Sequence, residues 1–445
     1  MDVAKLALKV PEVLLPGPGV ELHRWAVIAC DQYTSEPEYW EAVDRLVADR
    51  PSTLRLVFPE VYLEDAGGDA RIADINASMK QYLADGVLVS QGPGFVLVDR
   101  KTSHVPSRKG LIVALDLEAY DYRPGSKTLI RTTEGTIVDR LPPRIRVREN
   151  AAIELPHIMV LIDDPEQTVI EPLRQAELEK IYDFELMQGG GHLRGWRVAQ
   201  PELLEQVASA LGALAVKERF QKRYEVNDNE VMLYAMGDGN HSFATAKAIW
   251  EQLKSAASDP ADIMTHPARY ALVELVNLHD PGLEFEAIHR VVFDVSVDDL
   301  LARAEAYYQA VGTPCIVAEY PGLDAATAAV AAAGTAHAIA FVTAQGYAVL
   351  RIDQPSLTLE VATLQNFLDE YLKSRSKARI DYIHGDDAVT RLGSQQGNIG
   401  FYLPSISKHD LFRTIVRDGA LPRKTFSMGE ADEKRFYLEA RRITR

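Results

Sequence analysis

The sequence is short of the features that mark secreted and membrane proteins. It has two cysteines in 445 residues, Cys30 and Cys315, and their spacing matches neither a disulfide framework nor a cysteine-based zinc site. No apolar run approaches the roughly 20 residues that a membrane-spanning helix needs. The N-terminal stretch also lacks the continuous apolar core of a signal peptide. We therefore expect a soluble, cytoplasmic protein with no membrane partner.

Basic charge is scarce as well. The chain carries 64 acidic and 48 basic side chains, which gives a formal net charge of −16. A nucleic-acid-binding domain normally shows a clustered basic face, and no dense Lys/Arg block is present. We expect no nucleic-acid partner. The remaining composition, 47% hydrophobic and 25% charged, is that of an ordinary globular protein with a large core.

Strand-like and helix-like segments alternate along most of the chain, without a fixed-period repeat. This pattern predicts an α/β, mixed α+β fold. We divide the chain into an N-terminal section (1–150), a motif-bearing section (151–294) and a C-terminal α/β section (295–445). The positions of these boundaries are approximate. The stretch 201–224 has the spacing of one long helix.

A polar turn follows a buried strand near the middle of the chain. The sequence MGDGNHSFATAK, residues 236–247, comes directly after the apolar run 231–235 and leads into a helical pattern. Gly237 and Gly239 flank Asp238, so the backbone can turn sharply and approach a ligand closely. Asp238 can hold Mg²⁺ or accept a substrate proton.

The next three residues would form the first turn of the helix. Asn240, His241 and Ser242 stand where backbone amides and the helix dipole favour an anion such as phosphate. His241 can donate to a phosphoryl oxygen. The alternative is an ordinary helix start, with Asp238 or Asn240 as N-cap and His241 at the surface. The buried strand before the turn and the added His-Ser pair favour the functional interpretation.

A second candidate lies in IRTTEGTIVDRLPPRIRVREN, residues 130–150. Arginine suits the bidentate recognition of phosphate or carboxylate, which makes Arg131 and Arg140 candidates for binding. Thr133 is a neighbouring candidate. Glu134, among threonines, can act as a general base. For Glu134 and Arg140, a role in the site and a solvated strand edge remain equal alternatives.

Two further basic segments give weaker signals. Arg146 and Arg148 are typical of a solvated strand edge with salt bridges. In MQGGGHLRGWRV, residues 187–198, three glycines precede His192 and Arg194, which could bind a phosphate or carboxylate. The segment matches neither the P-loop nor the dinucleotide fingerprint. We interpret it as a flexible loop, with ligand contact as the minor alternative.

Four stretches, in order, resemble one family. They are WAVIACDQYTSEPEYW, RTTEGTIVDRLPPRIRVRENAAIELPHIMVLIDD, GDGNHSFATAK and HPARYALVELVNLHDPGLEFEAIHR. Together they closely resemble the uncharacterised bacterial and archaeal family known as domain of unknown function 1015 (DUF1015), over nearly the whole chain. The chain is identified as a member on these motifs, and the membership alone implies little about function.

GDGNHSFATAK is also similar to the D-G-H-H-R-x-x-A signature of the ParB/sulfiredoxin-like superfamily, which includes partition proteins, sulfiredoxin and free-serine kinases. The resemblance implies a ParB/sulfiredoxin-like core with additional α/β sections. It puts Asp238, Gly239 and His241 on a turn that handles phosphate and metal. It also makes Glu134 the counterpart of the general base of the serine kinases.

The motif departs from that signature at two positions. Asn240 stands where the kinases have their first histidine, and Ser242 stands where many members have arginine. One phosphate-contacting cation is therefore missing from the motif. Arg131 or Arg140 would have to supply it from elsewhere in the fold.

The resemblance implies phosphoryl transfer to a small hydroxy amino acid, by an ATP- or ADP-dependent free L-serine kinase that uses Mg²⁺. The runner-up is a phosphoserine phosphatase. An alternative of another class is a non-catalytic, nucleotide-binding regulatory protein, and a scaffold with a vestigial site is a third. The partners implied are small molecules, serine or phosphoserine and a nucleotide, with a homodimer as a further expectation.

Overall fold

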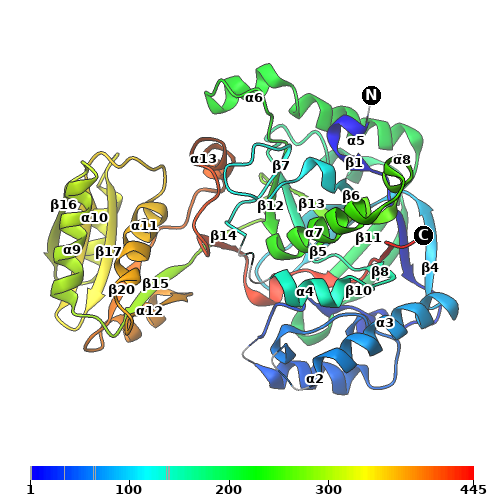
Figure 1. The fold of residues 1–445 in the computed structure, drawn as a ribbon, viewed down its shortest axis with the longest axis horizontal. Coiled ribbons are helices and arrows are strands. Elements are labelled where there is room, and N and C mark those ends of the chain that lie inside the picture. Colours follow the sequence, from blue (N-terminus) through cyan, green and yellow to red (C-terminus); the bar gives the residue numbers. More distant parts are fainter. Residues whose placement is uncertain (1–2, 35, 64, 66, 137, 139–140) are drawn as a thin grey trace. The chain divides into compact units, whose positions relative to one another are not determined.

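The computed structural model describes residues 3–34, 36–63, 65, 67–136, 138 and 141–445. The chain forms two units, Met1–Glu284 together with Gly429–Arg445 (the first unit) and Phe285–Met428 (the second unit). The structure confirms the mixed α+β fold class (Figure 1). Of the expected section boundaries, residue 150 lies inside the first unit and residue 294 inside the second.

One mixed sheet forms the centre of the first unit. Its order is β10-β11-β5-β6-β13-β9-β12-β7, and β1 pairs with β6 outside this path. β7 runs parallel to β12 and β13 parallel to β9, whereas the other neighbours are antiparallel. The strands are β1 (Leu8–Lys9), β5 (Phe95–Lys101), β6 (Arg108–Asp116), β7 (Ile130–Arg131), β9 (Met159–Ile162), β10 (Glu179–Glu185), β11 (His192–Val198), β12 (Tyr234–Asp238) and β13 (Tyr270–Asn277).

Helices and short strand pairs surround this sheet. The helices of the first unit are α1 (Leu22–Trp25), α2 (Pro37–Val47), α3 (Gly68–Ala84), α4 (Leu141–Arg148), α5 (Pro201–Leu214), α6 (Lys217–Tyr224), α7 (Asn240–Ala256) and α8 (Pro260–Ile263). The strand pairs are β2 (Glu12–Pro16) with β4 (Leu88–Pro93), β3 (Val27–Ile28) with β22 (Phe436–Tyr437), and β8 (Ile153–Glu154) with β23 (Arg441–Arg442).

The second unit contains an antiparallel sheet in the order β16-β18-β17-β20-β15-β19. Its strands are β15 (His289–Phe293), β16 (Cys315–Tyr320), β17 (His337–Thr343), β18 (Gly346–Ile352), β19 (Arg379–Ile383) and β20 (Ile399–Tyr402). Its helices are α9 (Val297–Ala310), α10 (Leu323–Ala331), α11 (Glu360–Lys373), α12 (Asp386–Gly393) and α13 (Leu411–Asp418). β14 (Phe285–Ala287) pairs with β21 (Phe426–Met428) where this unit begins and ends.

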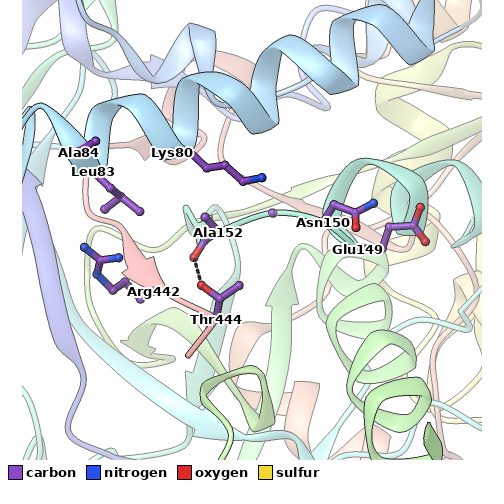
Figure 2. Close-up of a pocket in the computed structure, with 9 residues that line it drawn as sticks. Lys80, Leu83, Ala84, Glu149, Asn150, Ala152, Arg442 and Thr444 are labelled. Carbon is purple, nitrogen blue, oxygen red and sulfur yellow. Dashed lines mark hydrogen bonds between the residues drawn. The ribbon is translucent and has the colours of Figure 1, made fainter.

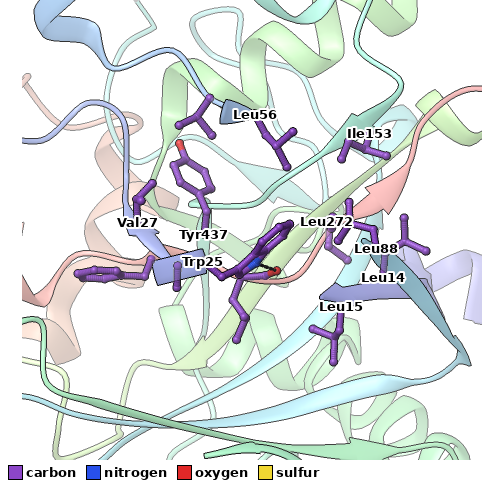
Figure 3. Close-up of a cluster of buried hydrophobic side chains, with 14 of the residues drawn as sticks. Leu14, Leu15, Trp25, Val27, Leu56, Leu88, Ile153, Leu272 and Tyr437 are labelled. Carbon is purple, nitrogen blue, oxygen red and sulfur yellow. Dashed lines mark hydrogen bonds between the residues drawn. The ribbon is translucent and has the colours of Figure 1, made fainter. Parts of the chain in front are cut away.

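The middle strands of the central sheet, from β5 to β12, are mostly buried on both faces. Side chains of one strand alternate between two apolar clusters: Leu272 of β13 belongs to one, and its neighbours Ala271 and Val273 belong to the other. This alternation follows from the two-residue period of a strand. The first cluster gathers Trp25, Leu272 and side chains from the N- and C-terminal strands (Figure 3). Because both faces are covered, a charged side chain within these strands needs a buried partner.

Three expectations about secondary structure are wrong. The stretch 201–224 forms two helices, α5 and α6, because Val216 takes an extended backbone between them. Residues 187–198 are largely strand β11 and not a flexible loop. Gly195 fits this strand because the ring of Tyr182 crosses it, so closely that a Cβ would lie 2.0 Å from the ring. Arg146 and Arg148 lie on helix α4 and not on a strand edge, although both form the expected salt bridges.

No helix in the described part of the chain is long and apolar enough to cross a membrane.

The C-terminal segment, Gly429–Arg445, returns to the first unit and crosses it as β22 and β23, red in Figure 1. Arg435 anchors it through buried ion pairs with Glu274 of β13 and with Glu439. Its Nε also donates to the carbonyl of Pro156 at 2.8 Å. Burial by itself would raise the pKa of Glu274, but Arg435 and Arg108 hold that pKa below its ordinary value.

Replacing Arg435 by methionine should destabilise the first unit by about 3–5 kcal/mol, because Glu274 and Glu439 would stay buried without their partner. Denaturant unfolding followed by tryptophan fluorescence measures the loss. Arg442→Met, at an exposed position on β23, is the control and should change stability by less than about 0.5 kcal/mol. Equal small losses in both variants would show that Arg435 is not an anchor.

Candidate functional site

The polar turn lies at one edge of the central sheet, where three strands present their ends. β7 and β12 run parallel, so the residues that follow both strands reach the same edge. β9 runs antiparallel to β12 and begins beside Asp238, which pairs with Met159. Residues 132–134, 238–242 and 157–158 therefore meet at this edge.

Gly237 and Gly239 shape the turn as the sequence predicts. The register between β12 and β9 shifts between Met236 and Asp238, which makes Gly237 the extra residue of a bulge. Gly239 has a φ of 79° and is the N-cap of α7, so no side chain caps the helix from this position. A Cβ on Gly239 would lie 3.1 Å from Ile158. The turn therefore needs glycine both for its backbone angle and for its space.

Asp238 is held as an anion at the start of α7. Its Oδ1 accepts a hydrogen bond from the amide of Gly239 at 2.8 Å, and its Oδ2 lies 3.2 Å from Nζ of Lys434. Burial would raise the pKa of Asp238, but Lys434, His157 and the Gly239 amide together hold that pKa below its ordinary value. The side chain is still 28% exposed. An ionised carboxylate beside a helix N-terminus, with access to solvent, can bind a cation or a polar ligand.

The segment that carries Glu134 is fastened to the motif helix. The hydroxyl of Thr132 donates to Oδ1 of Asn240 at 2.7 Å and also to the carbonyl of Glu134. The amide group of Asn240 donates to the hydroxyl of Thr133 at 3.4 Å. The structure thus brings residues 132–134 and the motif together, and it gives Asn240 a positioning role that the sequence did not suggest.

His157 joins the site from the residues just before β9. One ring nitrogen, Nε2, lies 3.0 Å from the hydroxyl of Ser242, and Nδ1 lies 2.7 Å from the hydroxyl of Tyr437. The Tyr437 hydroxyl also donates to Sγ of Cys30 at 3.1 Å. Ser242 therefore contacts a histidine where the superfamily signature has arginine. Burial is the main cause that raises the pKa of the Cys30 thiol, and the charges of Asp31 and Glu60 add to the rise.

Lys434 supplies a cation at the motif that the sequence prediction missed. Hydrogen bonds hold the chain at Lys434 in place. The Lys434 carbonyl accepts from Arg100 at 3.2 Å. The guanidinium of the next residue, Arg435, donates to the carbonyl of Pro156, directly before His157. Nothing in the sequence near residue 434 marks a site, because its partner Asp238 lies far away along the chain. Charged residues on either side of two adjacent aromatics in KRFYLEAR, residues 434–441, are the nearest thing to a signal in the local sequence.

Three of the other predicted binding residues are engaged with partners outside the motif. Arg131 donates to the carbonyls of Thr128 and Glu230 at 3.1 and 2.8 Å, so these bonds hold it among backbone groups. His192 pairs with Asp183 and Glu185, and Arg194 pairs with Asp99. His192 and Arg194 are on β11, five strands away from β12 in the sheet order. Arg140 lies outside the described residues. His241 is half-buried in the first turn of α7.

Neither a metal-binding cluster nor the wide hollow beside α3 adds a candidate site among the described residues. Among the described residues, no three or more His, Cys, Asp and Glu side chains gather in a way that could hold a metal by themselves. A wide hollow between α3 and the C-terminal strand is lined by Lys80, Glu149, Arg442 and Thr444, all of which are exposed (Figure 2). It has the character of open protein surface.

Comparison with known families gives one clear match. The sequence profile described as "Protein of unknown function (DUF1015)" matches residues 14–371. The chain belongs to this family. The range matched to DUF1015 includes Glu134, His157 and Asp238 and ends before Lys434.

No curated protein matches this DUF1015 chain. Among solved structures, it is similar to a conserved hypothetical protein from Pyrococcus furiosus, with 12% identity, TM-score 0.35, and 75% of this chain and 95% of that chain covered. A free serine kinase variant in complex with ADP has 11% identity and TM-score 0.38, over 75% and 92% of the two chains. SbnI from Staphylococcus aureus has 10% identity and TM-score 0.35, over 72% and 82%. At TM-scores this low, the likenesses carry no inference about what this DUF1015 protein binds.

Gly239→Ala should destabilise the protein more than Gly125→Ala. Both glycines have a φ of 79°, so each alanine incurs the left-handed backbone cost of about 1–2 kcal/mol. A Cβ at residue 125 would meet open space, whereas one at residue 239 would press on Ile158. Denaturant unfolding of the two variants isolates the crowding. Equal losses would mean that the turn has room for a side chain.

The pH dependence of stability should report the ionised state of Asp238. Because the folded-state pKa is depressed, the carboxylate stabilises the fold above its unfolded pKa of about 3.9 and loses this effect as the pH falls through the folded pKa. The free energy of unfolding of Asp238→Asn should therefore lie below that of the unaltered protein at pH 7, with a gap that narrows below about pH 4. A gap that does not change with pH would contradict the depressed pKa.

Proposed function

We propose that this protein is a phosphoryl-transfer enzyme that acts on a small hydroxy amino acid, with ATP or ADP as donor and L-serine as the leading acceptor. The observation that carries the proposal is the pairing of Asp238 with Lys434 at the N-terminus of α7. The backbone amides at the start of a helix and a lysine both stabilise the negative charge of a phosphoryl group during its transfer. The fixed carboxylate of Asp238 would hold the cation that accompanies nucleotide phosphates.

Glu134 is the proposed general base. The Thr132–Asn240 bond holds its segment against the motif helix, so its position is coupled to that of the phosphate seat. In the proposed step, the acceptor oxygen forms a bond to phosphorus while its proton passes to the Glu134 carboxylate. The bond from phosphorus to the bridging oxygen of the nucleotide breaks, and its electron pair stays on the nucleotide phosphate. Positioning and charge stabilisation supply most of the catalysis in such reactions.

Lys434 takes the place of the cation that the motif lacks. The sequence prediction looked for it in Arg131 or Arg140, whereas Arg131 is bonded to backbone carbonyls. Lys434 is the better candidate because it already faces Asp238. It can move its hydrogen bonds from the carboxylate to a phosphate oxygen without a change in the backbone.

The residues present fit Mg²⁺ in the manner common for nucleotide enzymes. Mg²⁺ keeps several waters and is bound by one or two carboxylates together with substrate phosphates, so the absence of a three-residue cluster from the described part of the chain is no obstacle. Asp238 is the residue that would hold it, since this carboxylate is ionised and partly exposed. When bound, the ion would supply neutralisation of phosphate charge.

Mass spectrometry of reactions that contain the protein, Mg²⁺, ATP or ADP and a panel of hydroxy amino acids tests this proposal. We expect a phosphorylated amino acid such as O-phosphoserine. Glu134→Gln should lower the rate by about 10²–10⁴-fold and Asp238→Asn by about 10²–10³-fold. Glu202→Gln, an exposed acid in the first turn of α5, is the matched control and should leave the rate unchanged.

Nucleotide binding without any phosphorylated product would contradict the proposal and indicate a regulatory protein. Release of inorganic phosphate from O-phosphoserine, with no forward transfer, would replace the kinase by a phosphatase. Full activity of both variants would remove Glu134 and Asp238 from the mechanism.

A further inference from the structure

A cavity of about 130 Å³ lies beside the motif helix, and several residues described at the site line it, among them His157 and Ser242. Its walls come from the segment after β3, the turns near residues 54–63, α3, α4, β8 and α7. Most of the lining is apolar and includes Leu56, Phe58, Leu63, Met79, Val147 and Leu155; the polar lining includes Cys30, Glu60, Arg144, Tyr437 and the Glu154–Arg148 pair. This volume lies below the roughly 300–1,000 Å³ of ordinary ligand pockets, so it suits a very small ligand.

Two ion pairs line the cavity, and they differ in how well their carboxylates are satisfied. Glu154 accepts from the amide of Leu272, from Arg148 and from Arg441. Although burial opposes it, the two arginines lower the pKa of Glu154. This pair is complete and structural.

In the other pair, Glu60 with Arg144, hydrogen bonds and positive charge replace less of the water that the carboxylate has lost. One guanidinium nitrogen of Arg144 lies 2.5 Å from Oε1 of Glu60, and the two side chains are 21% and 18% exposed. Burial raises the pKa of Glu60 in spite of Arg144, and Asp31 adds to the rise. A half-buried carboxylate of this kind gains from a further positive partner. The backbone is nevertheless fixed, since the Glu60 amide donates to the carbonyl of Cys30 at 2.7 Å.

His157 connects this pair to the motif. The imidazole lines the cavity together with Glu60 and Arg144, and it lowers the pKa of Glu60. Its Nε2 contacts the hydroxyl of Ser242 in the first turn of α7. A ligand in the cavity would thus have its charged pair at one end and the transfer site near the other.

We infer that this cavity binds the acceptor as a small α-amino acid zwitterion, with its ammonium on Glu60 and its carboxylate on Arg144. A zwitterion brings one charge of each sign, so it can replace one buried ion pair by two without adding net charge. The hydroxyl of the ligand would then point toward Ser242 and His157. That orientation rests on the proposed function, whereas recognition of the zwitterion does not.

Titration calorimetry with three probes tests the site in the full-length protein. L-serine carries both charges, ethanolamine lacks the carboxylate, and 3-hydroxypropanoate lacks the ammonium. L-serine should bind at least about tenfold more tightly than either analogue, because each loses a charge-assisted contact. If the three probes bound the unaltered protein with equal affinity, this result alone would overturn the inference.

Variants assign the contacts. Glu60→Gln should weaken the binding of L-serine by at least about tenfold, and L-serine should then bind no more tightly than 3-hydroxypropanoate. In Arg144→Met, L-serine should bind no more tightly than ethanolamine. If Arg144→Met fails to fold, Arg144→Lys replaces it in the experiment. This variant keeps the charge and should retain part of the selectivity for L-serine over ethanolamine. Arg146→Met, on the same helix but exposed and paired with Asp69 at 3.4 Å, is the control and should bind L-serine normally.

The outcomes separate this site from the proposed function. L-serine binding that depends on Glu60 and Arg144, without product from any donor, would support the cavity and contradict the kinase. Formation of O-phosphoserine with an unchanged KM for L-serine in Glu60→Gln and Arg144→Met would support the kinase and overturn the cavity as the acceptor site.

Discussion

The ion pair between Asp238 and Lys434 is the constraint on which the candidate site depends. A carboxylate that loses most of its water at a helix start stays ionised only if donors and positive charge replace that water. Lys434 provides much of this compensation, together with His157 and the Gly239 amide. The chain must leave the first unit at Glu284 and return at Gly429 before the pair can form. The site is therefore a product of the complete first unit and not of the motif alone.

Anchoring of the C-terminal segment extends that constraint into the core. Arg435 ties the residue next to Lys434 to β13 and to the carbonyl before His157. Tyr437, two residues farther on, contacts the His157 ring. One short segment thus sets the position of both the cation and the histidine. Rigid support of this kind is what preorganised charge stabilisation needs.

The sequence was sufficient for the fold class and for the local form of the motif. The alternation of strand-like and helix-like segments predicted mixed α and β structure. The apolar run and the glycines around Asp238 predicted a strand, a tight turn and a helix. All three are present, with the strand at Tyr234–Asp238 and not at 231–235. These features depend on residues close together in the chain. The continuous helix expected at 201–224 was wrong because periodicity does not register a single extended residue at Val216.

The partners of the motif could not be predicted in the same way. Lys434 and Tyr437 reach the site through pairing of β22 with β3, and strand pairing across the whole chain leaves no local pattern. His157 precedes an apolar strand like many core histidines. Arg131 has the right chemistry for phosphate, but tertiary structure directs it to the carbonyls of Thr128 and Glu230. Residue type indicated candidates, and only the three-dimensional arrangement distinguished among them.

A crystal structure of the protein with ADP and Mg²⁺ tests the central claim most directly. The account predicts that the terminal phosphate lies at the start of α7, with an oxygen within about 2.7–3.2 Å of Nζ of Lys434 and of a first-turn amide. A nucleotide bound elsewhere, with Lys434 still on Asp238 and the helix start closed by protein side chains, would contradict it.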